Sequence, residues 1–448
     1  MNNTLKLKTR LSALGFLEFA VWGAYLTSMG AYLGGVGLAE KIGWFYAVQG
    51  IVSIFMPALV GIVADRWIQA QKMLSLCHVL AGAFMLAAGI YGLHAGDNVS
   101  FAPLFALYTM SVAFFMPTIG LSNSVAYTAL SKAGLDTVKH FPPVRVFGTV
   151  GFICAMLFVN FTGFQNTPAQ LVTSAVLSFL LAIYSLTMPS CPTAGKDADK
   201  KSLSEALGLK AFALFKDKQM AIFFIFSMLL GVSLQITNGF ANPFIQSFGS
   251  VTEYADTWGV HNANALISLS QMSETLCILL IPFFLRRYGI KVVMVMAMSA
   301  WVFRFGFFGL GNPGSGVWLF ILSMIVYGIA FDFFNVSGSL YVDKKTTPDI
   351  RSSAQGLFMI MTNGIGATVG TLVAQQVINH NVLSRPAGMA QVEGWHTSWL
   401  IFAGYAAVVT ILFLIIFKDS DKKSADSDKL AKAEASTEGT PEGMTEII

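Results

Sequence analysis

Long apolar stretches follow one another along most of this sequence, and they constrain the fold more than any other feature. An α-helix of about 20 apolar residues is long enough to cross a membrane. The stretches are too long, and alternate too little, to be strands of a transmembrane barrel. The sequence therefore predicts an all-α integral membrane protein with twelve transmembrane helices. We place these helices near residues 11–34, 42–64, 73–93, 101–124, 143–162, 167–188, 220–247, 263–285, 290–310, 316–340, 352–378 and 397–417.

The composition excludes an ordinary soluble protein. Hydrophobic residues make up 55% of the 448 residues and charged residues only 12%, whereas about a quarter of the residues of a soluble protein are charged. The net charge of +4 comes from short clusters between apolar stretches, so we expect membrane lipid, and no nucleic acid, as a partner. The four cysteines lack the spacing of a metal site or a disulfide framework. No metal is expected, and nothing requires more than a monomer.

Basic residues are distributed very unequally between the predicted loops. The loops on one side of the membrane contain only Lys41 and Arg385. Because cytoplasmic loops carry an excess of lysine and arginine, we expect both termini in the cytoplasm of a multi-pass plasma membrane protein. The clusters on the basic side are Lys6 to Arg10, Arg66 with Lys72, Lys132 with Lys139, Lys196 to Lys218, Arg286 to Lys291, Lys344 to Arg351 and the lysines of the tail.

A long polar segment, residues 189–219, interrupts the apolar stretches near the middle of the chain. It predicts a cytoplasmic linker between two halves of six helices each, residues 1–188 and 220–417. Such paired halves are typical of carriers that rock around a central site. The last residues, 418–448, are rich in charged and small polar side chains, and we expect them to be disordered.

Five charged residues fall inside the apolar stretches: Glu18, Arg145, Glu274, Arg304 and Asp332. A charge at membrane depth costs on the order of 3 kcal/mol or more, so each should face the interior of the helix bundle and have a partner. The alternative to a functional role is an ion pair that locks helices together. Arg304 fits that structural interpretation best, and the spacing around Glu18 reveals no partner.

Polar residues at helical spacing accompany these charges. Arg145 and Thr149 are four residues apart and share one face of a helix. The same holds, three apart, for Gln235 with Asn238 and for Gln271 with Glu274. Amides and carboxylates suit ribose hydroxyls and the edge of a base, and an aromatic wall suits its flat face. Tyr327 and Phe331, four apart, are the best candidates for that wall, with Trp22 and Phe152 as others; packing alone is the alternative for any of them.

Several motifs resemble those of a known group of transporters. Residues 61–67, Gly-Ile-Val-Ala-Asp-Arg-Trp, resemble the loop motif of the major facilitator superfamily between helices two and three. Within that superfamily the chain resembles the nucleoside–proton symporter family, over roughly residues 5–417. The stretches that carry the resemblance are Phe141–Thr149, Gln235–Asn238, Ser270–Thr275 and Phe331–Asn335.

The resemblance implies import of nucleosides such as uridine or adenosine, with protons, across the bacterial inner membrane by alternating access. It implies that Asp332 matters for proton coupling. It further implies substrate contact for Arg145, Thr149, Gln235, Asn238, Gln271 and Glu274. Asp65 and Arg66 would then serve as a cytoplasmic gate.

Accumulation of a neutral solute needs an energy source, and the sequence contains no Walker A motif. A buried carboxylate that is exposed to each side in turn can carry a proton, and Asp332 and Glu274 are the two candidates. The proton is then the coupling ion, and no cofactor is expected. A proton-coupled sugar carrier and a sensor that binds without transport remain alternatives, while the absence of HExxH and of a nucleophile–base pair argues against an enzyme.

Overall fold

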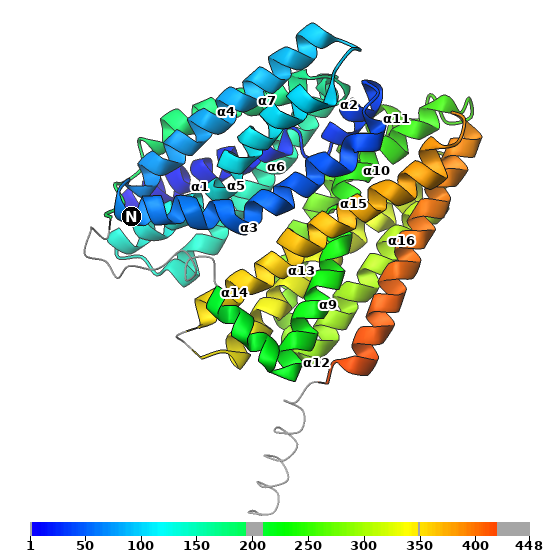
Figure 1. The fold of residues 1–448 in the computed structure, drawn as a ribbon. Coiled ribbons are helices and arrows are strands. Elements are labelled where there is room, and N and C mark those ends of the chain that lie inside the picture. The colour runs from blue at the N-terminus through cyan, green and yellow to red at the C-terminus, as the bar shows by residue number, and fades with distance from the viewer. Residues whose placement is uncertain (1, 194–208, 348–349, 419–448) are drawn as a thin grey trace, which may run out of the picture.

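The described part of the chain is helical throughout, with no strand (Figure 1). The computed structural model describes residues 2–193, 209–347 and 350–418. Over these residues the prediction of an all-α protein is confirmed. The tail predicted to be disordered lies outside the described residues from 419 onward, and so do residues 194–208 of the predicted linker.

The helices before the predicted linker gather on one side of the molecule in Figure 1, coloured blue to teal. We refer to them as the first helix group. Two short 3₁₀ turns, Ala39–Lys41 and Phe164–Asn166, join some of them. The helices are α1 (Asn2–Gly23), α2 (Met29–Gly35), α3 (Ile42–Arg66), α4 (Ala70–Ala95), α5 (Phe101–Lys132), α6 (Thr137–Phe161) and α7 (Ala169–Ser185).

The second helix group occupies the other side and is coloured green to orange in Figure 1. It begins with a 3₁₀ segment, Leu209–Lys216, and contains a second such turn at Phe248–Ser250 and π-helical turns at Ile360–Gly366 and Asn379–Leu383. Its helices are α9 (Lys218–Leu234), α10 (Ile236–Ser247), α11 (Trp258–His261), α12 (Ala263–Leu310), α13 (Val317–Lys345), α14 (Arg351–Met359), α15 (Ala367–Ile378) and α16 (Met389–Ile416).

Nine helical segments of the described residues are long and apolar enough to cross a membrane, judged by length and composition. One of them, α12, spans 48 residues and consists of two helices that meet at a kink, in agreement with the predicted helices 263–285 and 290–310. The backbone turns at Gly289, whose φ of 78° favours glycine over any residue with a side chain. Several predicted boundaries differ from the observed ones.

Two predicted helices are broken in the structure. The first helix stops at Gly23 and resumes at Met29. The helix predicted for 220–247 is broken at Gln235, between α9 and α10. Both breaks lie inside stretches that are apolar on average, so a hydropathy average does not reveal them.

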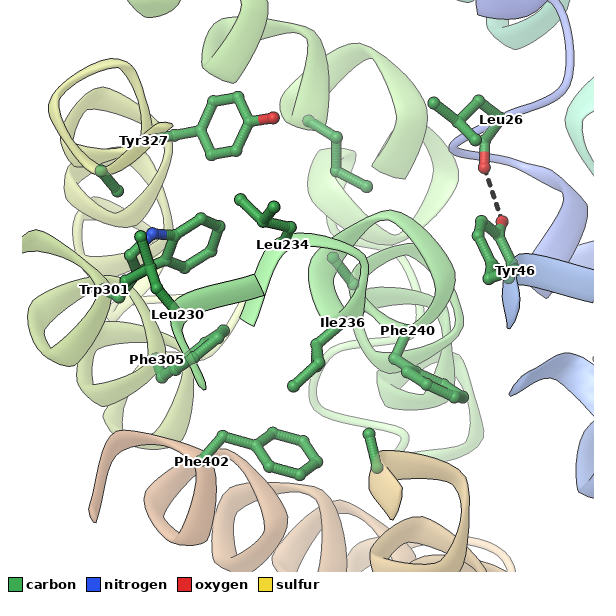
Figure 2. Close-up of a cluster of buried hydrophobic side chains, with 14 of the residues drawn as sticks. Leu26, Tyr46, Leu230, Leu234, Ile236, Phe240, Trp301, Phe305, Tyr327 and Phe402 are labelled. Atoms are coloured by element: carbon green, nitrogen blue, oxygen red, sulfur yellow. Dashed lines mark hydrogen bonds between the residues drawn. The ribbon is translucent and has the colours of Figure 1, made fainter. Parts of the chain in front are cut away.

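A cluster of apolar and aromatic side chains fills the second helix group around this break. Figure 2 shows Leu234 and Ile236 on either side of it, with Trp301, Phe305 and Phe402 packed nearby. Trp301 and Phe305 are fully buried, and their rings lie 5.4 Å apart. The packed cluster holds the broken helix in place.

The two helix groups meet along α3 and α15, α6 and α12, and α2 and α10. Within the first group, α1 and α6 approach unusually closely. A Cβ atom on Gly151 would lie 2.0 Å from the Phe16 carbonyl oxygen, and one on Gly23 would lie 2.4 Å from that of Phe152. Small residues permit such close helix packing in membranes, and here the packing fixes α1 against the helix that carries Arg145.

Candidate functional site

Gln235 occupies the break between α9 and α10. Its side-chain oxygen accepts a hydrogen bond of 2.9 Å from the Asn238 amide. Both side chains are half-buried, so the two amides predicted to share a face do so and also bind each other. One donor and one acceptor of the pair are used in this way.

Helix α13 carries three of the predicted site residues, Tyr327, Phe331 and Asp332. The Tyr327 ring stacks on that of Phe331, with ring centres 5.7 Å apart and planes inclined by 20°. In Figure 2 the Tyr327 hydroxyl points away from its own helix, above Trp301. Asp332 comes directly after this aromatic pair and is buried, with 6% of its surface exposed.

Acidic and basic side chains of α6, α12 and α13 interact electrostatically near Asp332. Glu274 and Gln271 lie half-buried on α12. Glu274 and Asp332 interact electrostatically with each other and with Arg145 on α6. Tyr327 also lies within electrostatic reach of both carboxylates. The structure thus brings together charges that are far apart in the sequence and belong to both helix groups.

One carboxylate oxygen of Asp332, Oδ2, is buried without a hydrogen-bond partner among the described residues. A buried carboxylate oxygen without a donor is costly, and protonation removes much of that cost. Asp332 is therefore well placed to exchange a proton.

Arg145 is half-buried, and its guanidinium carbon lies 4.0 Å from the centre of the Phe19 ring. This distance is typical of a cation–π contact. Thr149 lies one helical turn further along α6 and is also half-buried. The stacked ring covers one face of the guanidinium.

Arg304 is the fifth intramembrane charge and is fully buried. It donates a hydrogen bond of 2.8 Å to the Ser323 carbonyl oxygen and lies 4.2 Å from the centre of the Tyr327 ring. No carboxylate among the described residues lies within salt-bridge distance of it. Arg304 thus packs against the ring of Tyr327. Its position in the sequence did not reveal this contact.

Hydrogen bonds between the two helix groups concentrate at one end of the molecule, near α2, α10 and α11 (Figure 1). We call this the closed end. Gln165 and Asn160 of the first group accept from the backbone N–H groups of Asn264 and Ala265, at 3.3 and 3.1 Å. These N–H groups belong to the first turn of α12, which has no partner for them within the helix. The first helix group therefore provides the acceptors that these backbone donors of the second group need.

Further bonds strengthen the closed end. Thr27 donates to the Asn264 side chain, and Gln375 accepts from the Gly43 N–H at 2.6 Å. Several more hydrogen bonds between described residues join the two helix groups at this end, from Asn160, Gln165, Gln246, Thr368 and Gln375. The opposite end contains the N-terminus of α1 and the basic ends of α3, α5 and α13, and we call it the basic end.

The gate predicted at Asp65 and Arg66 lies at the basic end. Arg66 is the last residue of α3 and is half-buried. The Asp65 side chain lies outside the described residues, so this gate remains a prediction.

Comparison with known proteins agrees with this arrangement. The profile of the family described as "Nucleoside H+ symporter" matches residues 5–422. The chain belongs to this family. The nucleoside permease NupG of Escherichia coli K12 is 46% identical to this chain over 418 residues. The match covers 92% of this chain and 96% of NupG. The xanthosine permease of the same organism is 45% identical over an equal length.

A solved structure of a relative extends the agreement to three dimensions. A crystal structure of the nucleoside transporter NupG superposes on this chain with a TM-score of 0.82 at 45% identity, over 92% of this chain and all of that chain. This member of the nucleoside H+ symporter family is therefore a multi-pass membrane transporter, and the relatives named here are permeases rather than enzymes.

Proposed function

We propose that the protein is a secondary active transporter that imports nucleosides together with protons by alternating access. The observation that carries the proposal is that Arg145 from the first helix group lies within electrostatic reach of Glu274 and Asp332 from the second. A cation and two acids at membrane depth suit a polar substrate and a proton better than an apolar solute. The names of the relatives, which mention nucleosides and xanthosine, support this substrate class.

We further propose twelve transmembrane helices with both termini in the cytoplasm. Nine candidate spans are long enough, and one of these, α12, contains two helices that meet at Gly289. The shorter α7 and the interrupted pair of α1 and α2 would complete the count. The excess of basic residues at the basic end supports its cytoplasmic location. The two helix groups then correspond to the halves 1–188 and 220–417, with residues 189–219 as the linker.

The proposed substrate site lies between the two helix groups. The guanidinium of Arg145 would donate to oxygens of the nucleoside, and Glu274 would accept from ribose hydroxyls. The amides would form hydrogen bonds with the edge of the base. Tyr327 would stack on the face of the base, a contact worth about 1–3 kcal/mol. The proposed contact residues are Arg145, Thr149, Gln235, Asn238, Gln271, Glu274, Tyr327 and Phe331.

The closed end indicates which state of the transport cycle this is. Because the hydrogen bonds between the helix groups close one end, we infer an inward-facing state, with the basic end on the cytoplasmic side. In the outward-facing state Asp332 would take up a proton from the acidic side, because a neutral carboxylic acid crosses an apolar interior at much lower cost than a carboxylate. Nucleoside and proton would then be released together on the inner side.

Uptake of labelled uridine into proteoliposomes tests the proposal. With the outside acidified, we expect uridine to accumulate above its external concentration, and a protonophore to abolish the accumulation. Adenosine should compete with it, whereas lactose and galactose should not. Competition by the sugars instead would identify a sugar carrier, and uridine binding without any uptake would identify a sensor; either result contradicts the proposal.

A further inference from the structure

Glu18 and His78 form a buried pair outside the proposed substrate site. Both side chains are completely buried, and His78 Nε2 lies 3.0 Å from Glu18 Oε2. Thr118 donates a hydrogen bond of 2.6 Å to Glu18 Oε1. On the other side of the imidazole, His78 Nδ1 lies 2.9 Å from Ser178 Oγ. The pair thus connects α1, α4, α5 and α7.

Hydrogen bonds occupy the polar atoms of both side chains. The Ser178 hydroxyl donates to the His78 carbonyl oxygen at 3.0 Å, and its oxygen faces His78 Nδ1. The Thr118 hydroxyl lies 2.6 Å from Glu18 Oε1 and equally close to the Phe115 carbonyl oxygen. Both carboxyl oxygens of Glu18 are therefore held by contacts with other helices.

The neighbour of Glu18 in the sequence connects this pair to the substrate site. Phe19 follows Glu18 on α1 and stacks on the Arg145 guanidinium at 4.0 Å. Gly148 makes room for the stack, since a Cβ atom there would lie 2.7 Å from the Phe19 ring and 2.9 Å from the Arg145 guanidinium. A small rotation of α1 would move the ring off the guanidinium. Glu18 resists such a rotation because its carboxyl group is held by two other helices.

We propose that Glu18 and His78 are positioning residues that orient Arg145 for the substrate by fixing Phe19 against it. This inference rests on the proposed function of Arg145. It assigns a role to a buried acid that has no contact with the substrate. The pair acts through its hydrogen bonds, so an uncharged side chain of the same shape should replace Glu18.

Kinetics of uridine uptake by four variants test the inference. Glu18→Ala should raise the KM by about tenfold and change the maximal rate less than twofold. Glu18→Gln should stay within twofold of the wild type, because its amide donates to His78 Nε2 and its oxygen accepts from Thr118. Phe19→Leu should raise the KM as Glu18→Ala does. The double variant Glu18→Ala/Phe19→Leu should be no worse than either single variant, since both changes release the same contact.

A matched control separates positioning from general loss of packing. Ser111 lies on α5 in the same helix group, and its hydroxyl donates a hydrogen bond of 2.8 Å to the Ala81 carbonyl oxygen. Ser111→Ala should leave the KM unchanged. If Glu18→Ala does not yield folded protein in a thermal melting assay, Thr118→Val replaces it in the comparison, because it keeps the shape of the side chain and removes the hydroxyl that contacts Glu18 Oε1 and the Phe115 carbonyl oxygen.

The outcomes distinguish this inference from the proposed function. A folded wild type that neither binds nor transports uridine overturns the proposed function. A wild type that transports, together with KM increases that multiply in the double variant, overturns the positioning role. A Glu18→Gln variant as impaired as Glu18→Ala also overturns it, because Glu18 would then act on Arg145 through its charge.

Discussion

Asp332 is the residue on which proton coupling is proposed to depend, and its unpaired Oδ2 atom sets it apart. Asp332→Asn removes the titratable group but keeps the size of the side chain. We expect this variant to lose uphill accumulation of uridine and to retain exchange of internal for external uridine, because exchange needs no net proton movement. Counterflow in proteoliposomes measures the exchange. Full accumulation by the variant would exclude Asp332 as the proton carrier.

Arg304 provides a second prediction at the scale of single residues. Its guanidinium lies 4.2 Å from the centre of the Tyr327 ring, and a desolvated cation–π contact is worth about 2 kcal/mol. Arg304→Met should raise the KM for uridine by up to about tenfold while the protein still folds, because loss of a buried unpaired charge offsets the loss of packing. As a control, Arg351→Met breaks only an exposed ion pair with Asp343 and should have no effect. Equal KM values for both variants would contradict the support of Tyr327 by Arg304.

The residues of the candidate site could be chosen from the sequence, but their partners could not. The cost of a charge in a membrane selects Glu18 and Arg304 without any structure. The partner of Glu18 is His78, two helices away in the chain, and no spacing rule connects them. Phe19 is one of 38 phenylalanines, so only its contact with Arg145 distinguishes it.

At the scale of helices, glycine determines how closely α9 and the segment around α15 pack. A Cβ atom on Gly231 would lie 2.3 Å from the Thr362 carbonyl oxygen. Gly231→Ala must push the helices apart, and overpacking of this kind costs about 1–3 kcal/mol. We expect a lower melting temperature of the purified protein. Gly306→Ala, a change in α12 where nothing lies within 4 Å of the added Cβ atom, serves as the control and should melt like the wild type.

Hydropathy predicted the approximate positions of the helices but not their interruptions. The side chains on both sides of Gln235 are apolar, so a search for apolar runs passes over the break. At Gly289 the two predicted helices are both present, and they meet at a kink within α12. In both places backbone geometry decides the outcome, and hydropathy does not record backbone geometry.

At the scale of the whole molecule, the closed end should open and close during transport. Thr27 and Asn264 bond to each other across it, so cysteines at these two positions could be joined by a short thiol crosslinker. In a background with the exposed Cys154 replaced by serine, crosslinking should stop uridine uptake, and reduction should restore it. Each single cysteine variant should be unaffected by the reagent. Continued uptake by protein shown to be crosslinked would contradict alternating access at this end.

The chemistry of the closed end has a consequence for the conditions in which the protein can operate. Its hydrogen bonds join amides, hydroxyls and backbone groups, and among the described residues none of them joins two charged side chains. Dissolved salt screens the attraction between exposed ions, largely so beyond about 10 Å at 0.1 M, but acts little on contacts between neutral groups. The closed end should therefore stay closed to the same extent at low and at high salt.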